Sequence, residues 1–169
     1  LNTGNKILRI IPWGISAELN KALPNENTDS REIDLLGVGN LIPIKNYMDF
    51  IEIVAQIADL FPHVKACLIG EGPEKDKLFK KIQEKGLEKN FSLKGSLSRE
   101  KVLEYMSRSK VLVHPALYEG QGYVFYEALS KGCKIVSYAV GSAKQSDNWE
   151  VCEDRYHMVQ AIMKQQVVN

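Results

Sequence analysis

The sequence lacks the features that define several classes of protein. Its 169 residues include only three cysteines, Cys67, Cys133 and Cys152, and no C-x-x-C pair. We therefore expect reduced, buried thiols rather than a disulfide or a metal site. No apolar run approaches the roughly 20 residues that a membrane-spanning helix needs. The 22 Lys and Arg residues are balanced by 21 Asp and Glu, which argues against a nucleic-acid partner but leaves room for a small basic patch facing a phosphate group.

Familiar cofactor and metal motifs are missing as well. No G-x-G-x-x-G follows the first apolar run, which argues against an oxidoreductase of the Rossmann type, and there is no G-x-x-x-x-G-K-[ST] loop. The histidines at 63, 114 and 157 are scattered, and no H-x-x-x-H or D-x-D cluster suggests a catalytic metal. We interpret each histidine as solvated or hydrogen-bonded in place rather than catalytic.

Short apolar runs alternate with helical stripes from about residue 31 onward. We expect strands at 33–38, 64–69, 91–94, 111–113 and 134–138, and helices at 48–60, 74–85, 99–108 (with Ser98 as N-cap), 123–131 and 154–165. This alternation predicts an α/β fold, a Rossmann-like parallel sheet with helices on both faces. Residues 31–169 should form one domain. Residues 1–30 are polar and turn-rich, and we expect them to be a connector cut from a longer chain.

Glycines mark nearly every strand exit. They occur in the segments 37–40, 70–73, 95–96, 119–122 and 141–142. Turn geometry explains any one of them. Because ligands of open parallel sheets bind at the carboxyl ends of the strands, five such exits on one edge favour a backbone that comes close to a ligand.

Two glutamates flank the turn between the fourth strand and its helix. The turn Gly120-Gln-Gly-Tyr123 offers free N–H groups and a helix N-terminus, which suit a diphosphate. Lys45, after the first strand, could add a positive charge. Glu127 could then accept two ribose hydroxyls, and Glu119 could face whatever group the diphosphate carries. The alternative is that Glu127 complements the helix dipole and Glu119 is a solvated loop residue.

The segment containing these glutamates resembles a known family. Within YEGQGYVFYEALSKG they form the E-x7-E motif of the retaining family 4, "glycosyl transferases group 1", and the chain is similar to the C-terminal, nucleotide-sugar-binding domain of these GT-B enzymes. The resemblance covers about residues 11–143. The other matching segments are IPWGIS at 11–16, GVGNLIPIKNY at 37–47, LIGEGPEKDKL at 68–78 and the run at 91–120.

The resemblance implies a role for each matching residue. Glu119 and Lys45 would be catalytic, the first contacting the donor sugar and the second neutralising the diphosphate leaving group. Glu127 would bind the ribose hydroxyls. The other expected donor-binding residues are Gly39, Asn40, Gly70, Gly72, Ser96, Leu97, Gly120, Gln121, Gly122, Tyr123 and Val124.

The function implied by the resemblance is transfer of a hexosyl group from a UDP-, GDP- or ADP-sugar with retention of configuration. It would need no metal or cofactor and would serve polysaccharide or glycoconjugate synthesis. The acceptor site would lie on the protein's own N-terminal domain, absent here, so residues 1–169 alone should transfer little or nothing. The expected location is the cytoplasm, with the full-length protein a candidate for peripheral association with the inner face of the membrane. The alternative is a non-catalytic nucleotide-sugar-binding subunit that works with a separate partner chain.

The chain departs from the family pattern at three places. Asn40 stands where the family often has arginine, and a neutral amide bonds phosphate without charge assistance. Pro115-Ala116 replaces the usual Pro-Ser. After Gln145 the chain proceeds almost directly to Asn148, where the family has an acidic residue and a longer loop.

Overall fold

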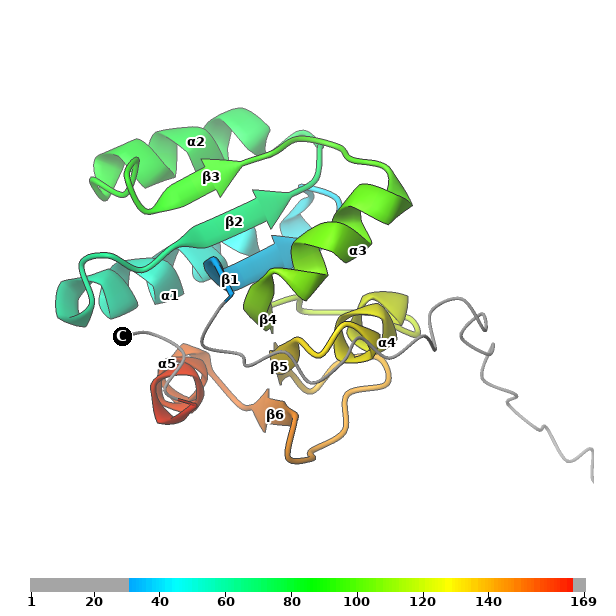
Figure 1. Cartoon of the computed structure of the whole chain (residues 1–169). Helices are drawn as coiled ribbons and strands as arrows, with labels where there is room; N and C mark the ends of the chain where they lie inside the picture. Colours follow the sequence, from blue (N-terminus) through cyan, green and yellow to red (C-terminus); the bar gives the residue numbers. More distant parts are fainter. Residues whose placement is uncertain (1–30, 166–169) are drawn as a thin grey trace, which may run out of the picture.

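The computed structural model describes residues 31–165, which form a six-stranded parallel sheet (Figure 1). The strand order is β3-β2-β1-β4-β5-β6, and all five pairings are parallel. The order reverses between β1 and β4, where the chain stops adding strands to one side of β1 and begins on the other. The strands are β1 (Ile33–Val38), β2 (Ala66–Ile69), β3 (Phe91–Leu93), β4 (Ser109–His114), β5 (Lys134–Tyr138) and β6 (Trp149–Cys152).

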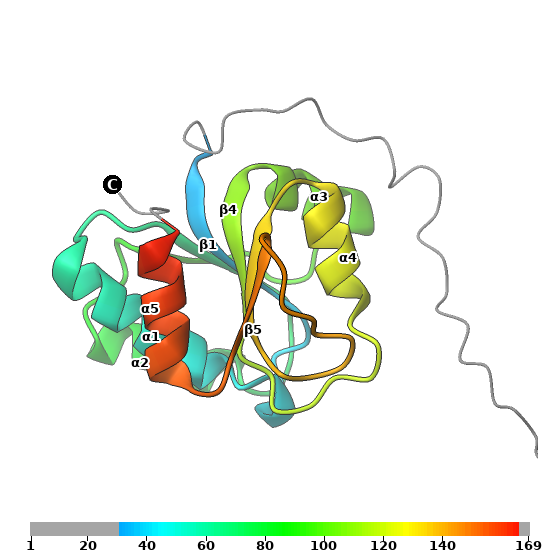
Figure 2. The ribbon, with the colours of Figure 1, turned by 90° about the horizontal axis from the view of Figure 1, so that it is seen from below.

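The helices cover both faces of this sheet (Figure 2). On one face lie α1 (Tyr47–Leu60), α2 (Lys75–Glu84) and α5 (Arg155–Lys164). On the other lie α3 (Arg99–Ser107) and α4 (Tyr123–Ser130), and a single 3-10 turn, η2 (Pro43–Lys45), precedes α1. Crossovers between parallel strands are right-handed, so reversing the direction of strand addition moves the connecting helices to the opposite face.

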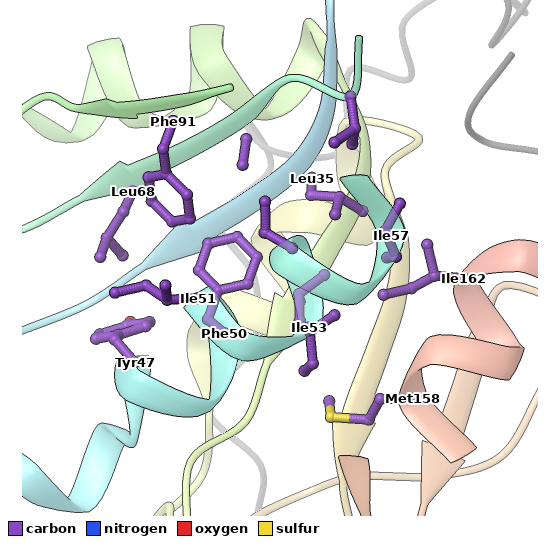
Figure 3. Close-up of a cluster of buried hydrophobic side chains, with 14 of the residues drawn as sticks. Leu35, Tyr47, Phe50, Ile51, Ile53, Ile57, Leu68, Phe91, Met158 and Ile162 are labelled. Carbon is purple, nitrogen blue, oxygen red and sulfur yellow. The ribbon is translucent and has the colours of Figure 1, made fainter. Parts of the chain in front are cut away.

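The strands are buried because helices lie on both sides of them. All four residues of β2 are buried. On the face of α1, Phe50 meets Phe91 edge to face, with ring centroids 5.3 Å apart. Figure 3 shows Met158 and Ile162 of α5 directed toward α1, which extends the same core cluster to α5. Such burial on both faces explains why the strands are short apolar runs without strict alternation.

Local signals in the sequence position the helix ends. The Ser98 hydroxyl accepts a hydrogen bond from the Lys101 N–H at 3.4 Å, as its predicted N-cap role requires. The carboxylate of Asp154 caps α5 in the same way, through the His157 N–H at 2.9 Å. Each cap therefore satisfies one backbone donor that would otherwise lack a partner.

The predicted fold class is confirmed, and the expected elements are present with end shifts of one or two residues. One strand was missed: the sequence predicts five, and β6 adds a sixth at the edge. It has four residues, of which only Trp149 and Cys152 are buried, so it lacks the apolar run that marks the others. All three cysteines are buried and free, as expected. The predicted connector, residues 1–30, lies outside the described residues.

Candidate functional site

The loops that leave β1, β4 and β5 meet at the carboxyl edge of the sheet. The Leu117 N–H donates to the Ile44 carbonyl at 2.9 Å, which joins the β4 loop to the β1 loop. The Ser142 hydroxyl donates to the Gln121 carbonyl at 2.7 Å, which joins the β5 loop to the turn before α4. This convergence lies at the reversal of strand order, where open α/β sheets bind their ligands.

Lys45 and Glu119 come together at this point, although 74 positions separate them in the chain. The Lys45 ammonium donates to Oε2 of Glu119 in a short ion pair. Their side chains are only 17% and 18% exposed. His114, the last residue of β4, lies with Nε2 at 3.1 Å from the same oxygen. Three ionisable side chains from three loops and strand ends thus form one partly buried cluster.

The cluster changes the protonation behaviour of its members. Burial favours the neutral form of Glu119, but the hydrogen bond and charge of Lys45, with a smaller contribution from His114, outweigh it and lower the pKa of the carboxyl group. Burial, followed by the positive charge of Lys45, lowers the pKa of His114 to about 4. At neutral pH the site therefore holds an ionised Glu119 and a neutral imidazole.

Glu127 lies on α4 and has a different partner. Its Oε1 accepts a hydrogen bond from Nε of Arg99, the first residue of α3, at 2.9 Å. The Glu127 side chain is 19% exposed and that of Arg99 is 59% exposed. The alternative in which Glu127 only complements the dipole of its own helix therefore omits its main contact.

The turn before α4 is shaped by Gly122. This residue is the N-cap of α4, has a φ of 68°, and no side chain caps the helix. A Cβ at this position would lie 2.4 Å from the ring of Phe125, so glycine is required on two grounds. The first N–H groups of α4 therefore meet no capping side chain, at the positive end of the helix dipole.

The β1 and β2 exits are pressed against each other. The Gly39 N–H donates to the Ile69 carbonyl at 3.0 Å, and a Cβ on Gly70 would lie 1.9 Å from the Gly39 carbonyl oxygen. Close approach of the neighbouring backbone thus requires glycine at position 70, whatever binds there. A donor contact by Gly70 stays a prediction, as does one by Gly72, which approaches Leu41 in the same way.

The remaining predicted site residues lie on loops at the same edge. Asn40 is exposed on the β1 loop, and Gly120 is exposed on the β4 loop. Ser96 is exposed and Leu97 half-buried between β3 and α3. Tyr123 and Val124 are the first two residues of α4, and the Tyr123 side chain is 48% exposed. Their roles in donor binding stay predictions.

Sequence reasoning missed three residues of this site. His114 was interpreted as hydrogen-bonded in place, which is correct, but its partner Glu119 was not foreseen. Extending the predicted strand 111–113 by one residue would have brought His114 to the ligand edge. Arg99 gave no signal beyond its place in the first turn of a helix. Tyr47 is fully buried near Gly39, and its hydroxyl has no hydrogen-bond partner among residues 31–165.

Other features of residues 31–165 do not add to this site. They contain no group of three or more His, Cys, Asp or Glu side chains that could hold a metal ion. A hollow of about 670 Å³ lies at the amino ends of β2 and β3, lined by residues such as Lys65, Asn90 and Arg108, and none of the predicted site residues lines it. Within the same residues, no helix has the length and apolar character to cross a membrane. The expected location in the cell stays a prediction.

Comparison with known proteins gives consistent matches. A curated relative, the poly(ribitol-phosphate) alpha-N-acetylglucosaminyltransferase of Staphylococcus aureus, is 33% identical over 104 residues, which is 61% of this chain and 20% of that protein. The crystal structure of S. aureus TarM in complex with Fondaparinux, alpha-GlcNAc-glycerol and UDP superposes with a TM-score of 0.73 at 27% identity, covering 85% of this chain and 29% of that one. Sucrose-phosphate synthase from Thermosynechococcus elongatus shares the fold, with a TM-score of 0.77 at 22% identity over 94% of this chain and 43% of that chain.

These matches assign both fold and family. The parallel sheet with helices on both faces is that of the Rossmann-like domains of GT-B glycosyltransferases. The chain spans about a fifth of the length of the S. aureus relative. The family described as glycosyl transferases group 1 matches residues 20–148, which is most of the chain. This protein therefore belongs to the group 1 glycosyltransferases.

Proposed function

We propose that this chain is the donor-binding part of a retaining glycosyltransferase of family 4, which moves a hexosyl group from a nucleoside diphosphate sugar to an acceptor. The observation that carries the proposal is the meeting of Lys45 and Glu119 beside the uncapped N-terminus of α4. A cation and free N–H groups suit a diphosphate, and a carboxylate beside them suits the hydroxyls of a sugar.

In the proposed reaction, the bond between the sugar and the diphosphate breaks as the sugar becomes oxocarbenium-like. Negative charge then accumulates on the leaving diphosphate. The ammonium of Lys45 and the N–H groups of Tyr123 and Val124 stabilise that charge from fixed positions. Asn40 contributes a neutral amide, which bonds a phosphate oxygen more weakly than a guanidinium does.

The two glutamates hold the rest of the donor. Glu119 accepts hydrogen bonds from hydroxyls of the sugar, and Glu127 accepts them from the ribose. Arg99 keeps the Glu127 carboxylate ionised and oriented toward the cleft while the site is empty. Because each carboxylate offers two acceptor oxygens, each can bond a hydroxyl while keeping its protein partner.

The relatives support the substrate class. TarM was crystallised with UDP, and Alr3699/HepE of Anabaena was crystallised with UDP-glucose. The S. aureus relative is named for transfer to a poly(ribitol-phosphate) chain, so we propose a role in polysaccharide or glycoconjugate synthesis. Because these relatives are much longer, we propose that the acceptor site lies on a part of the protein outside this chain. The reaction we propose needs no metal.

Calorimetric titration tests donor binding. Residues 1–169 are titrated with UDP, GDP and ADP, with and without EDTA, beside Glu127→Ala and the matched control Glu88→Ala, an exposed glutamate in the turn before β3. One diphosphate should bind saturably, EDTA should have no effect, and Glu127→Ala should weaken binding about tenfold or more, since hydrogen bonds to a charged group are lost. Equal affinity in the two variants, or no binding at all, would contradict the proposal.

Transfer itself is tested with the full-length protein. A sugar bond of the same anomeric configuration as the donor, observed by NMR of the product, is expected for a retaining enzyme. Residues 1–169 alone should form no product under the same conditions. An inverted product would refute retention, and appreciable turnover by the fragment would refute the assignment of the acceptor site to a missing part.

A further inference from the structure

His114 is the member of the Lys45–Glu119 cluster that the proposed function leaves without a task. Its side chain is 1% exposed, and Nε2 lies 3.1 Å from Oε2 of Glu119. A histidine at the end of a central strand could instead point its ring nitrogens at backbone groups. Here one nitrogen meets a carboxylate, and the other, Nδ1, is buried without a hydrogen-bond partner among the described residues.

The direction of this hydrogen bond follows from the charges around it. Lys45 and Glu119 are the charged groups that face the ring. Burial and the nearby ammonium keep the imidazole neutral, so it carries a single N–H. An ionised carboxylate can only accept, so that proton belongs on Nε2, and Nδ1 is left as an acceptor. His114 therefore donates to Glu119.

The ring itself is held firmly. It packs edge to face on Phe125, with centroids 4.8 Å apart, and Phe125 packs on Trp149 at 4.5 Å. The indole N–H of Trp149 donates to the Ser137 hydroxyl at 2.8 Å, which anchors this stack to β5. A donor fixed in this way can orient a carboxylate without being reoriented by it.

Lys45 and His114 both bond the same oxygen, Oε2, whereas Oε1 has no hydrogen-bond partner among residues 31–165. A bound diphosphate would compete with Glu119 for the ammonium of Lys45. Glu119 would then lose its strongest partner at the moment when it must hold the sugar. The imidazole cannot follow the diphosphate, because its ring is fixed by Phe125.

We propose that His114 is a positioning residue: its Nε2–H holds Oε2 of Glu119 when Lys45 turns to the diphosphate, which leaves Oε1 directed at a hydroxyl of the donor sugar. This inference rests on the proposed function. It adds that recognition of the sugar, as distinct from the nucleotide, depends on a buried histidine that does not touch the donor.

Two variants and one spectroscopic measurement test the role. His114→Gln keeps an N–H donor at similar reach, and His114→Met has similar length without a donor. Each is titrated with the nucleoside diphosphate that binds the wild type and with its glucose ester. His114→Met should reduce the preference for the sugar ester over the plain diphosphate about tenfold, with affinity for the diphosphate unchanged. His114→Gln should restore most of the preference.

The outcomes separate this inference from the proposed function. No binding of UDP, GDP or ADP by the wild type removes both. Intact diphosphate binding with the same sugar preference in all three proteins overturns the role of His114 alone, and so does an equal loss for both ligands, which indicates a structural role. Nitrogen-15 NMR of the wild type provides a test independent of folding of the variants: the Nε2–H tautomer supports the inference, and the Nδ1–H tautomer overturns it.

Discussion

Replacing Gly122 by alanine should destabilise the fold far more than the same change two residues earlier. At Gly122 the backbone is left-handed, with a φ of 68°, which costs a residue with a Cβ about 1–2 kcal/mol. The new Cβ would also lie 2.4 Å from the ring of Phe125, which is fully buried. Forcing that ring aside is overpacking and costs about 1–3 kcal/mol more. At Gly120 an added Cβ meets nothing within 4 Å, and the expected change is within about 0.5 kcal/mol.

Urea denaturation measures the difference directly. Gly122→Ala should lower the free energy of unfolding by about 2–4 kcal/mol, with an unchanged m-value, and the midpoint of thermal unfolding should fall by about 4–16 °C. Gly120→Ala should match the wild type or be slightly more stable, since alanine restricts the unfolded chain. Similar stabilities for the two variants would refute the argument that position 122 is held in a left-handed conformation against Phe125.

Three further predictions concern buried polar groups. Because the pKa of His114 is lowered from 6.5 to about 4 in the folded chain, the unfolded chain alone takes up a proton as pH falls from about 6.5 toward 4, so the wild type should lose stability relative to His114→Gln across that window in urea titrations, and a constant difference would contradict this. Tyr47→Phe removes a buried hydroxyl that lacks a partner among the described residues, so the free energy of unfolding should stay the same or rise by about 1–2 kcal/mol, whereas a clear fall would reveal a partner. Burial raises the pKa of Cys133 to about 12 and the other two thiols are also buried, so Ellman's reagent at pH 8 should react with the native chain only as fast as it unfolds, and rapid reaction would contradict the burial.

Much of the fold was predictable from local pattern. Strands such as 33–38 and helices such as 123–130 follow from apolar runs and glycine boundaries, and Ser98 is the N-cap that its sequence position suggests. The strand at 149–152 was not predictable in this way. Its burial depends on Trp149 packing against Phe125, a residue 24 positions away, and only the folded chain supplies that neighbour.

The candidate site was partly predictable. The edge of the sheet on which Lys45 and Glu119 lie follows from the alternation of strands and helices, because every parallel strand ends at that edge. Their pairing could not be derived, since nothing in the local sequence says that the loop after β1 meets the loop after β4. The partners of the two glutamates, His114 and Arg99, were hidden for the same reason.

The sequence by itself determined the α/β class, the glycine-rich edge and the residue types available for a diphosphate and a sugar. These depend on periodicity and backbone freedom, which act over a few residues. The tertiary structure alone decided which side chains share a proton or a charge: Lys45 with Glu119, Glu119 with His114, and Glu127 with Arg99. The physical reason is that these contacts depend on the order of strands in the sheet, which places the exits of β1 and β4 side by side, and on burial that only a packed core provides.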